Sequence, residues 1–195
     1  MRSLFAALLL LAGSAWALPI PPFISEIHYD NAGADSGEFV ELSGADADLA
    51  GWALHFYNGA TGSPYDVLDL SGLLPAGELT AIAFFPTFSI QNGPADGVVL
   101  VNAAGEVVEF IAYEGILLGQ SGPADGMQAR PLPLNESGDT PLGTSLQRTS
   151  MTDPDAWSAV AATPGVLNPG LVALPSSAWL LLVGLLLVSR LRRSA

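Results

Sequence analysis

The stretch HYDNAGADSGEFVEL, residues 28–42, concentrates side chains that could bind a metal ion. Its oxygen-bearing residues suit Ca²⁺, which prefers carboxylate and amide oxygens; they are Asp30, Asn31, Asp35 and Glu38. The spacing is not that of an EF-hand loop. Two interpretations are open: a calcium site, or a polar hairpin loop in which Asp and Asn side chains bond to the local backbone.

A second group of chemistry-bearing residues flanks this stretch. Glu26 and His28 alternate along one predicted strand and therefore share a face, and Glu41 lies on the next predicted strand. A histidine beside two carboxylates could perform general acid–base catalysis or hold part of a metal site. The alternative, which we favour, is a polar sheet face that points to solvent.

The sequence predicts a scaffold of β-strands for these residues. Short runs rich in Val, Ile, Phe and Tyr alternate with clusters of Gly, Pro, Asn and Asp. Before the C-terminal tail, no segment has sustained helical periodicity. Seven strands in this length favour an all-β sandwich of two sheets, with a long surface loop over residues 119–144. The predicted strands are 23–29, 38–43, 52–57, 79–85, 98–102, 107–113 and 145–149.

Both ends of the chain carry membrane-related signals. Residues 1–17 are typical of a secretory signal peptide, with Arg2 ahead of an apolar run and cleavage predicted after Ala17. Residues 176–189 carry no charge, and three arginines follow them, which predicts a short transmembrane helix with the domain outside and the tail inside. A helix over these residues would be about 21 Å long, short of a ~30 Å hydrocarbon core. The arginines are Arg190, Arg192 and Arg193.

The order of features at the C-terminus resembles the PEP-CTERM sorting signal. The matching residues are Val172, Leu174 and Pro175, followed by the apolar segment and the arginines. The resemblance implies that an exosortase-type membrane enzyme recognises the motif and removes the tail. Ala173 departs from a common form of the motif, which has proline there. A plain single-pass membrane anchor is therefore the alternative.

Charge and composition limit the kinds of partner that the domain can have. All 19 acidic residues lie in the range 26–155, which has two arginines and no lysine, a net charge of −17. Nucleic-acid affinity comes largely from cationic contacts, so we expect no nucleic-acid partner. Such a surface attracts divalent cations, or it serves solubility outside the cell. The chain has no cysteine, which excludes disulfides and thiolate chemistry.

Nine motifs in sequence order resemble the bacterial lamin tail domain. They are ISEIHYDNAG (24–33), GEFVEL (37–42), DLAGWAL (48–54), YNG (57–59), IQNG (90–93), VVEF (107–110), YEG (113–115), SLQR (145–148) and TPGVLN (163–168). The resemblance implies an immunoglobulin-like β-sandwich. It also implies an accessory or interaction module, because such domains accompany secreted nucleases or phosphatases or stand beside a membrane anchor. It supplies no catalytic residues.

The expected organisation is a signal peptide (1–17), a lamin-tail-like sandwich (23–160), a linker (161–174) and a sorting or transmembrane segment (175–195). The leading hypothesis is an exported, non-enzymatic binding or structural module at the cell envelope or in the extracellular matrix, with calcium as a candidate support. The second is an accessory subunit of a secreted nuclease or phosphatase system, bound through an exposed strand edge. The third is a hydrolase that uses Glu26, His28 and Glu41.

Overall fold

The structure, a computed structural model, describes residues 20–171, and these are almost entirely β. Strands hold 41% and helices 4% of them, which confirms the predicted all-β class. Within residues 20–171, no helix is long and apolar enough to cross a membrane. The predicted cleavage site and the predicted sorting residues lie outside the described residues; they are Ala17, Val172, Leu174, Pro175, Arg190, Arg192 and Arg193.

Five strands form the first sheet, in the order β12-β11-β1-β2-β7, and all neighbours are antiparallel. The register places Glu26 of β1 opposite Glu41 of β2 on one side and opposite Gln147 of β11 on the other. The sheet therefore brings the two glutamates side by side. The strands are β1 (Ile20–His28), β2 (Phe39–Ala45), β7 (Thr80–Phe84), β11 (Thr144–Arg148) and β12 (Trp157–Ala161).

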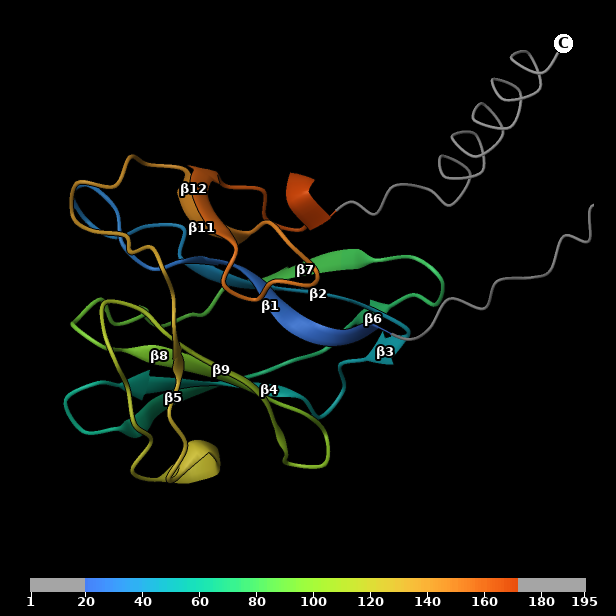
Figure 1. Cartoon of the computed structure of the whole chain (residues 1–195), viewed down its shortest axis with the longest axis horizontal. Helices are drawn as coiled ribbons and strands as arrows, with labels where there is room; N and C mark the ends of the chain where they lie inside the picture. The colour runs from blue at the N-terminus through green and yellow to red at the C-terminus, as the bar shows by residue number, and fades with distance from the viewer. Residues whose placement is uncertain (1–19, 172–195) are drawn as a thin grey trace, which may run out of the picture.

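The second sheet also has five strands, in the order β10-β9-β8-β4-β5. Its pairings are antiparallel except that of β10 with β9, which is parallel. Figure 1 shows the two sheets as two layers, with the small sheet of β3 (Ala47–Asp48) and β6 (Leu73–Leu74) beside them. The strands of the second sheet are β4 (Ala53–Asn58), β5 (Ser63–Asp69), β8 (Gly97–Val101), β9 (Val107–Ala112) and β10 (Arg130–Pro131).

The core lies between the two sheets, where alternate apolar side chains of each strand meet. This period-2 pattern arises because successive residues of a strand point to opposite faces. Beyond the ends of β1 and β9, the rings of Tyr29 and Tyr113 stack at 4.0 Å between centroids and join the layers. The buried core residues include Ile24, Ile27, Val40, Leu42 and Leu146 from the first sheet and Leu54, Phe56, Val98, Leu100 and Ile111 from the second.

All seven predicted strands are present, but the prediction missed two of the longer ones. β5 reads SPYDVLD, and its Pro64 and two aspartates resemble turn chemistry. β12 reads WSAVA, which has few of the residues that favour strands. The surface loop predicted over 119–144 is wrong in part. It contains the 3₁₀ turn η1 (Gly122–Ala124) and β10, and Leu132 and Glu136 are buried.

Residues 162–171, here called the C-terminal strap, are packed on the first sheet. The strap lies on the side of this sheet that faces away from the second sheet, and it ends in the turn η2 (Pro169–Leu171) (Figure 1). Asn168 is fully buried, and its Nδ2 donates to the carbonyl oxygens of Ser25 at 2.7 Å and Arg148 at 3.2 Å. The stretch expected as a linker is therefore part of the domain as far as Leu171, whose side chain is also buried.

Gly170→Ala should destabilise the protein, because a Cβ at this position would lie 2.3 Å from the carbonyl oxygen of Thr149. Relieving such an overlap costs about 1–3 kcal/mol, so the Tm measured by circular dichroism should fall. Gly138→Ala is the matched control, since a Cβ there meets nothing within 4 Å. Equal Tm values for the two variants would contradict the packing of the strap.

Candidate functional site

The loop between β1 and β2 is shaped by its own polar groups. The buried Asn31 accepts a hydrogen bond from the backbone N–H of Ser36 at 3.0 Å and donates Nδ2 to the carbonyl oxygen of Ala34 at 3.1 Å. Gly33 and Gly37 have positive φ values of 95° and 73°, which glycine adopts without strain. The loop is thus a side-chain-bonded turn of the kind that Asn and Gly commonly form.

The carboxyl groups of this loop bind separate donors. Asp35 accepts from Nδ2 of Asn92 at 3.1 Å, and Glu38 accepts from the backbone N–H of Ile90 at 3.1 Å. Burial, together with the charge of Asp35, raises the pKa of Asp30 above its usual value. Across residues 20–171, no group of three or more acidic, histidine or cysteine side chains is placed to hold a metal ion. The contacts within the loop fit the hairpin-loop interpretation, and the calcium site stays a prediction.

Glu26, His28 and Glu41 do not form one catalytic site. Glu26 and Glu41 have no exposed surface, and His28 is 4% exposed. His28 pairs with Glu136, whereas the two glutamates bond to the C-terminal strap. The prediction that these residues make a solvent-facing polar face is wrong, because segments distant in sequence cover them.

The two glutamates fasten the strap to the sheet. Thr163 donates its backbone N–H to Oε1 of Glu26 and its hydroxyl to Oε2, both at 2.9 Å. The backbone N–H of Gly165 donates to Oε2 of Glu41 at 2.8 Å, and Oγ of Ser25 donates to Oε1 at 2.8 Å. A hydrogen bond contributes about 0.5–1.5 kcal/mol to stability and about 1.5–3 kcal/mol when one partner is charged, so the contacts with Thr163 and Gly165 stabilise the attachment of the strap.

A contact between His28 and Glu136 attaches the segment around Glu136 to the end of β1. Nδ1 of His28 lies 2.9 Å from Oε1 of Glu136, and its Nε2 lies 3.3 Å from the carbonyl oxygen of Ser36. Both ring nitrogens thus face acceptors, which suits the doubly protonated ring. Burial lowers the pKa of His28, but the hydrogen bond and charge of Glu136 outweigh it, so the pKa is raised overall.

Glu136 is a residue that the sequence analysis did not single out as functional. Its Oε2 also accepts from the backbone N–H groups of Tyr29 at 2.6 Å and Asp30 at 3.1 Å. It lies in a stretch rich in Pro and Gly, and no apolar pattern marks its burial. Asp96 acts in the same way, accepting from the N–H groups of Gly59 and Gly93 at 2.6 and 2.9 Å.

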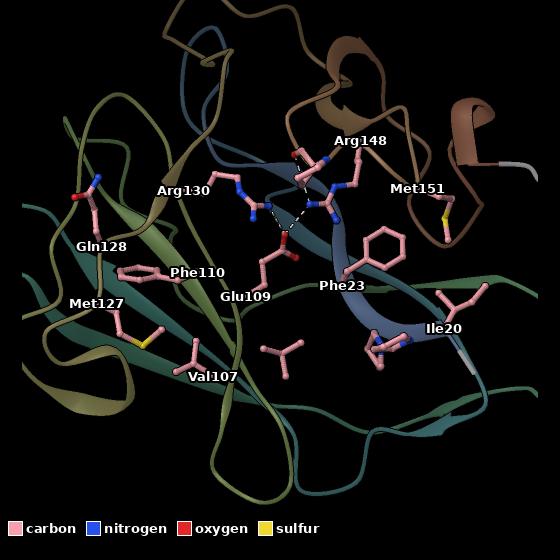
Figure 2. A pocket seen from close by; sticks show the side chains of 14 residues that line it. Ile20, Phe23, Val107, Glu109, Phe110, Met127, Gln128, Arg130, Arg148 and Met151 are labelled. Carbon is pink, nitrogen blue, oxygen red and sulfur yellow. Dashed lines mark hydrogen bonds and ion pairs between the residues drawn. The ribbon is translucent and has the colours of Figure 1, made fainter. Parts of the chain in front are cut away.

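A pocket of about 590 Å³ opens where β1 and β11 of the first sheet approach β9 and β10 of the second. Its polar centre is Glu109 on β9, towards which Arg130 and Arg148 both point (Figure 2). Glu109 Oε1 lies 2.7 Å from Nη2 of Arg148 and 3.6 Å from Nη1 of Arg130. Its Oε2 accepts from the backbone N–H of Ile24 at 2.8 Å and thereby ties the two sheets together.

The side chain of Arg148 is buried in the domain, whereas that of Arg130 lies at the rim of the pocket. The guanidinium carbon of Arg148 lies 5.0 Å from the ring centroid of Phe23 and 5.7 Å from that of Trp157, within cation–π range. The side chain of Arg148 is 8% exposed and that of Arg130 is 42% exposed. Arg148 is therefore a structural contact of β11, and Arg130 is accessible from solvent.

The stability of the protein should fall as pH rises from about 4.5 through 7, in part because of Glu41. Burial raises the pKa of Glu41 to about 7, against an unfolded value of 4.5. In this range the folded protein holds a proton that the unfolded chain releases, so the stabilisation present below pH 4.5 is lost as pH rises through about 7. The raised pKa of His28 acts in the same direction at higher pH.

Glu41→Gln isolates this contribution, since glutamine can still accept from Gly165 and donate to Ser25. Relative to the native chain, the variant should gain at most about 3 kcal/mol of unfolding free energy between pH 4.5 and 8. Urea unfolding across this range measures the difference, and the contribution of His28 cancels because both proteins share it. A difference that does not change with pH would show that Glu41 does not titrate in this range.

Comparisons of the chain with protein-family models, with curated proteins and with solved structures gave no match.

Proposed function

We propose that the protein is an exported, non-enzymatic binding or structural module, held at the cell envelope by its C-terminal segment or sorted from there to the surface. The all-β sandwich is compatible with the immunoglobulin-like, lamin-tail-type fold that the sequence motifs favour, and we include that fold in the proposal. The carboxyl groups that are buried or have raised pKa values accept hydrogen bonds from loops. This use of the carboxyl groups supports a non-catalytic role. Calcium is not needed for this proposal.

The observation that carries the proposal is the attachment of the C-terminal strap to the first sheet. A module that is tethered through its C-terminus must pass any pull on the tether to the folded body. Here the last described residues before the predicted sorting motif are fastened by Glu26, Glu41 and Asn168 to three neighbouring strands. Leu171 is itself buried. A force applied to the chain after this residue would be distributed over the contacts between the strap and the sheet before it acted on the end of any one strand.

A second candidate function is that of an accessory subunit in a secreted nuclease or phosphatase system. The observation that favours it is the outer edge of β12, the last strand of its sheet. Ala159, Val160 and Ala161 are exposed there, and the strand has neither a charged residue nor proline to block pairing with another strand. Addition of a partner strand at such an edge is a common mode of recognition.

The mass of the mature protein tests the proposal. Intact-mass spectrometry of the protein recovered from the envelope fraction should show a chain that begins at Leu18. Loss of the residues after the Pro175 motif would support sorting, whereas an intact C-terminus would support the plain anchor. A chain that retains residues 1–17 and is recovered away from the envelope would contradict the proposal.

A further inference from the structure

The pocket around Glu109 differs from the rest of the domain in charge. The range 20–171 contains 19 acidic residues but two cationic ones, Arg130 and Arg148, and both line this pocket. Glu109 is the one acidic residue among the pocket-lining residues. Among the residues that line the pocket, positive charges therefore outnumber negative ones by one, and Asp155, 3.7 Å from Arg130, lies beside them.

Within residues 20–171, the ion pairs of Arg130 are long. Its nitrogens lie 3.6 Å from Glu109 and 3.7 Å from Asp155, longer than the about 2.7–2.9 Å of a charge-assisted hydrogen bond. The side chain of Asp155 is 67% exposed, and a pair at such a position contributes about 0–1 kcal/mol. Within residues 20–171, Nε of Arg148 is also buried with no hydrogen-bond partner. The pocket thus has more donors than acceptors.

Most of the residues that line the pocket are apolar, although polar atoms form about half of its exposed wall. Phe23, Val107 and Phe110 contribute from the two sheets, and Met127 and Met151 lie on opposite sides of the pocket in Figure 2. Methionine side chains adapt to ligands of different shape. The volume of about 590 Å³ falls within the range of about 300–1,000 Å³ that is usual for small-molecule sites.

We propose that this pocket binds a small amphipathic carboxylate, with its anionic head on Arg130 and its apolar body against Phe23, Phe110 and the two methionines. The guanidinium fork of Arg130 matches a carboxylate, and the ligand would accept at hydrogen-bond distance, which the longer pairs with Glu109 and Asp155 do not reach. Glu109, Asp155 and the surrounding acidic surface repel a singly charged carboxylate less than a doubly charged phosphate, which favours the carboxylate. This inference is independent of the proposed envelope role.

The methionines provide a selective probe. The chain has three, of which Met127 and Met151 line the pocket and Met1 lies in the predicted signal peptide. The full chain, held in lipid nanodiscs and labelled at the methionine methyl groups, would be titrated with sodium octanoate while methyl NMR spectra are recorded. Octan-1-ol and octylamine test whether the charge of the head group matters. Octanoate should shift both methyl signals to saturation, and the two controls should bind at least about tenfold more weakly.

Two matched variants separate charge recognition from apolar contact. Arg130→Gln should weaken octanoate binding at least about tenfold. Asp155→Asn removes the competing carboxylate and should strengthen binding by up to about fivefold. The spectra of the unliganded variants show whether each one is folded. The absence of a saturable shift, equal binding of octanol and octanoate, or unchanged affinity in Arg130→Gln would each overturn the proposal. If Arg130→Gln does not fold, the head-group comparison in the native chain still decides.

Discussion

Carboxyl groups inside this domain accept hydrogen bonds from backbone N–H groups that are distant in the sequence. Glu26 holds Thr163, Glu41 holds Gly165, and Glu136 holds the residues at the end of β1. Asp96 and Glu109 do the same for a loop and for β1. Since the chain has no cysteine and no lysine, disulfides cannot close its loops and few cationic side chains can pair with its acids. Backbone amides are the partners that the chain does provide.

This constraint explains why an acidic protein can have buried acidic residues. A carboxyl group without partners in the interior is costly, but several donors compensate for lost hydration. Four donors meet the carboxyl group of Glu26: two from Thr163, one from Ser145 and one from Gln147. Glu41 has fewer donors, and burial raises its pKa to about 7. The contact of Glu41 with the strap is therefore sensitive to pH near 7.

The sequence predicted the sheets better than the segments that cover them. The strands around Ile27, Leu42 and Val98 were recognisable because runs rich in Val, Ile, Phe and Tyr lie between clusters of Gly, Pro, Asn and Asp. The register that pairs Glu26 with Glu41 follows from their positions on adjacent strands. By contrast, TPGVLN has the composition of a linker, and its attachment to the first sheet depends on the buried Asn168 and on two backbone N–H groups. No periodic pattern could indicate such contacts.

The pocket could not be predicted for a related reason. Its polar centre combines Glu109, Arg130 and Arg148 from three separate strands, and the parallel pairing of β10 with β9 that places Arg130 involves two residues. The sequence did show that cationic residues are rare in this range. The position of these residues at one pocket follows from the tertiary structure and not from the sequence pattern. The tertiary structure also separates His28 from the two glutamates.

Amide hydrogen exchange at Thr163 and Gly165 tests the central claim most directly. If the buried glutamates hold the strap, these two amides should be protected to a degree similar to the amides of β11, although they lie outside any strand. Glu26→Gln should reduce the protection of Thr163 more than that of the β8 amides. Exchange of Thr163 and Gly165 in the native chain as fast as that of the exposed Gly138 would contradict the account, because the strap would then open independently of the sheet.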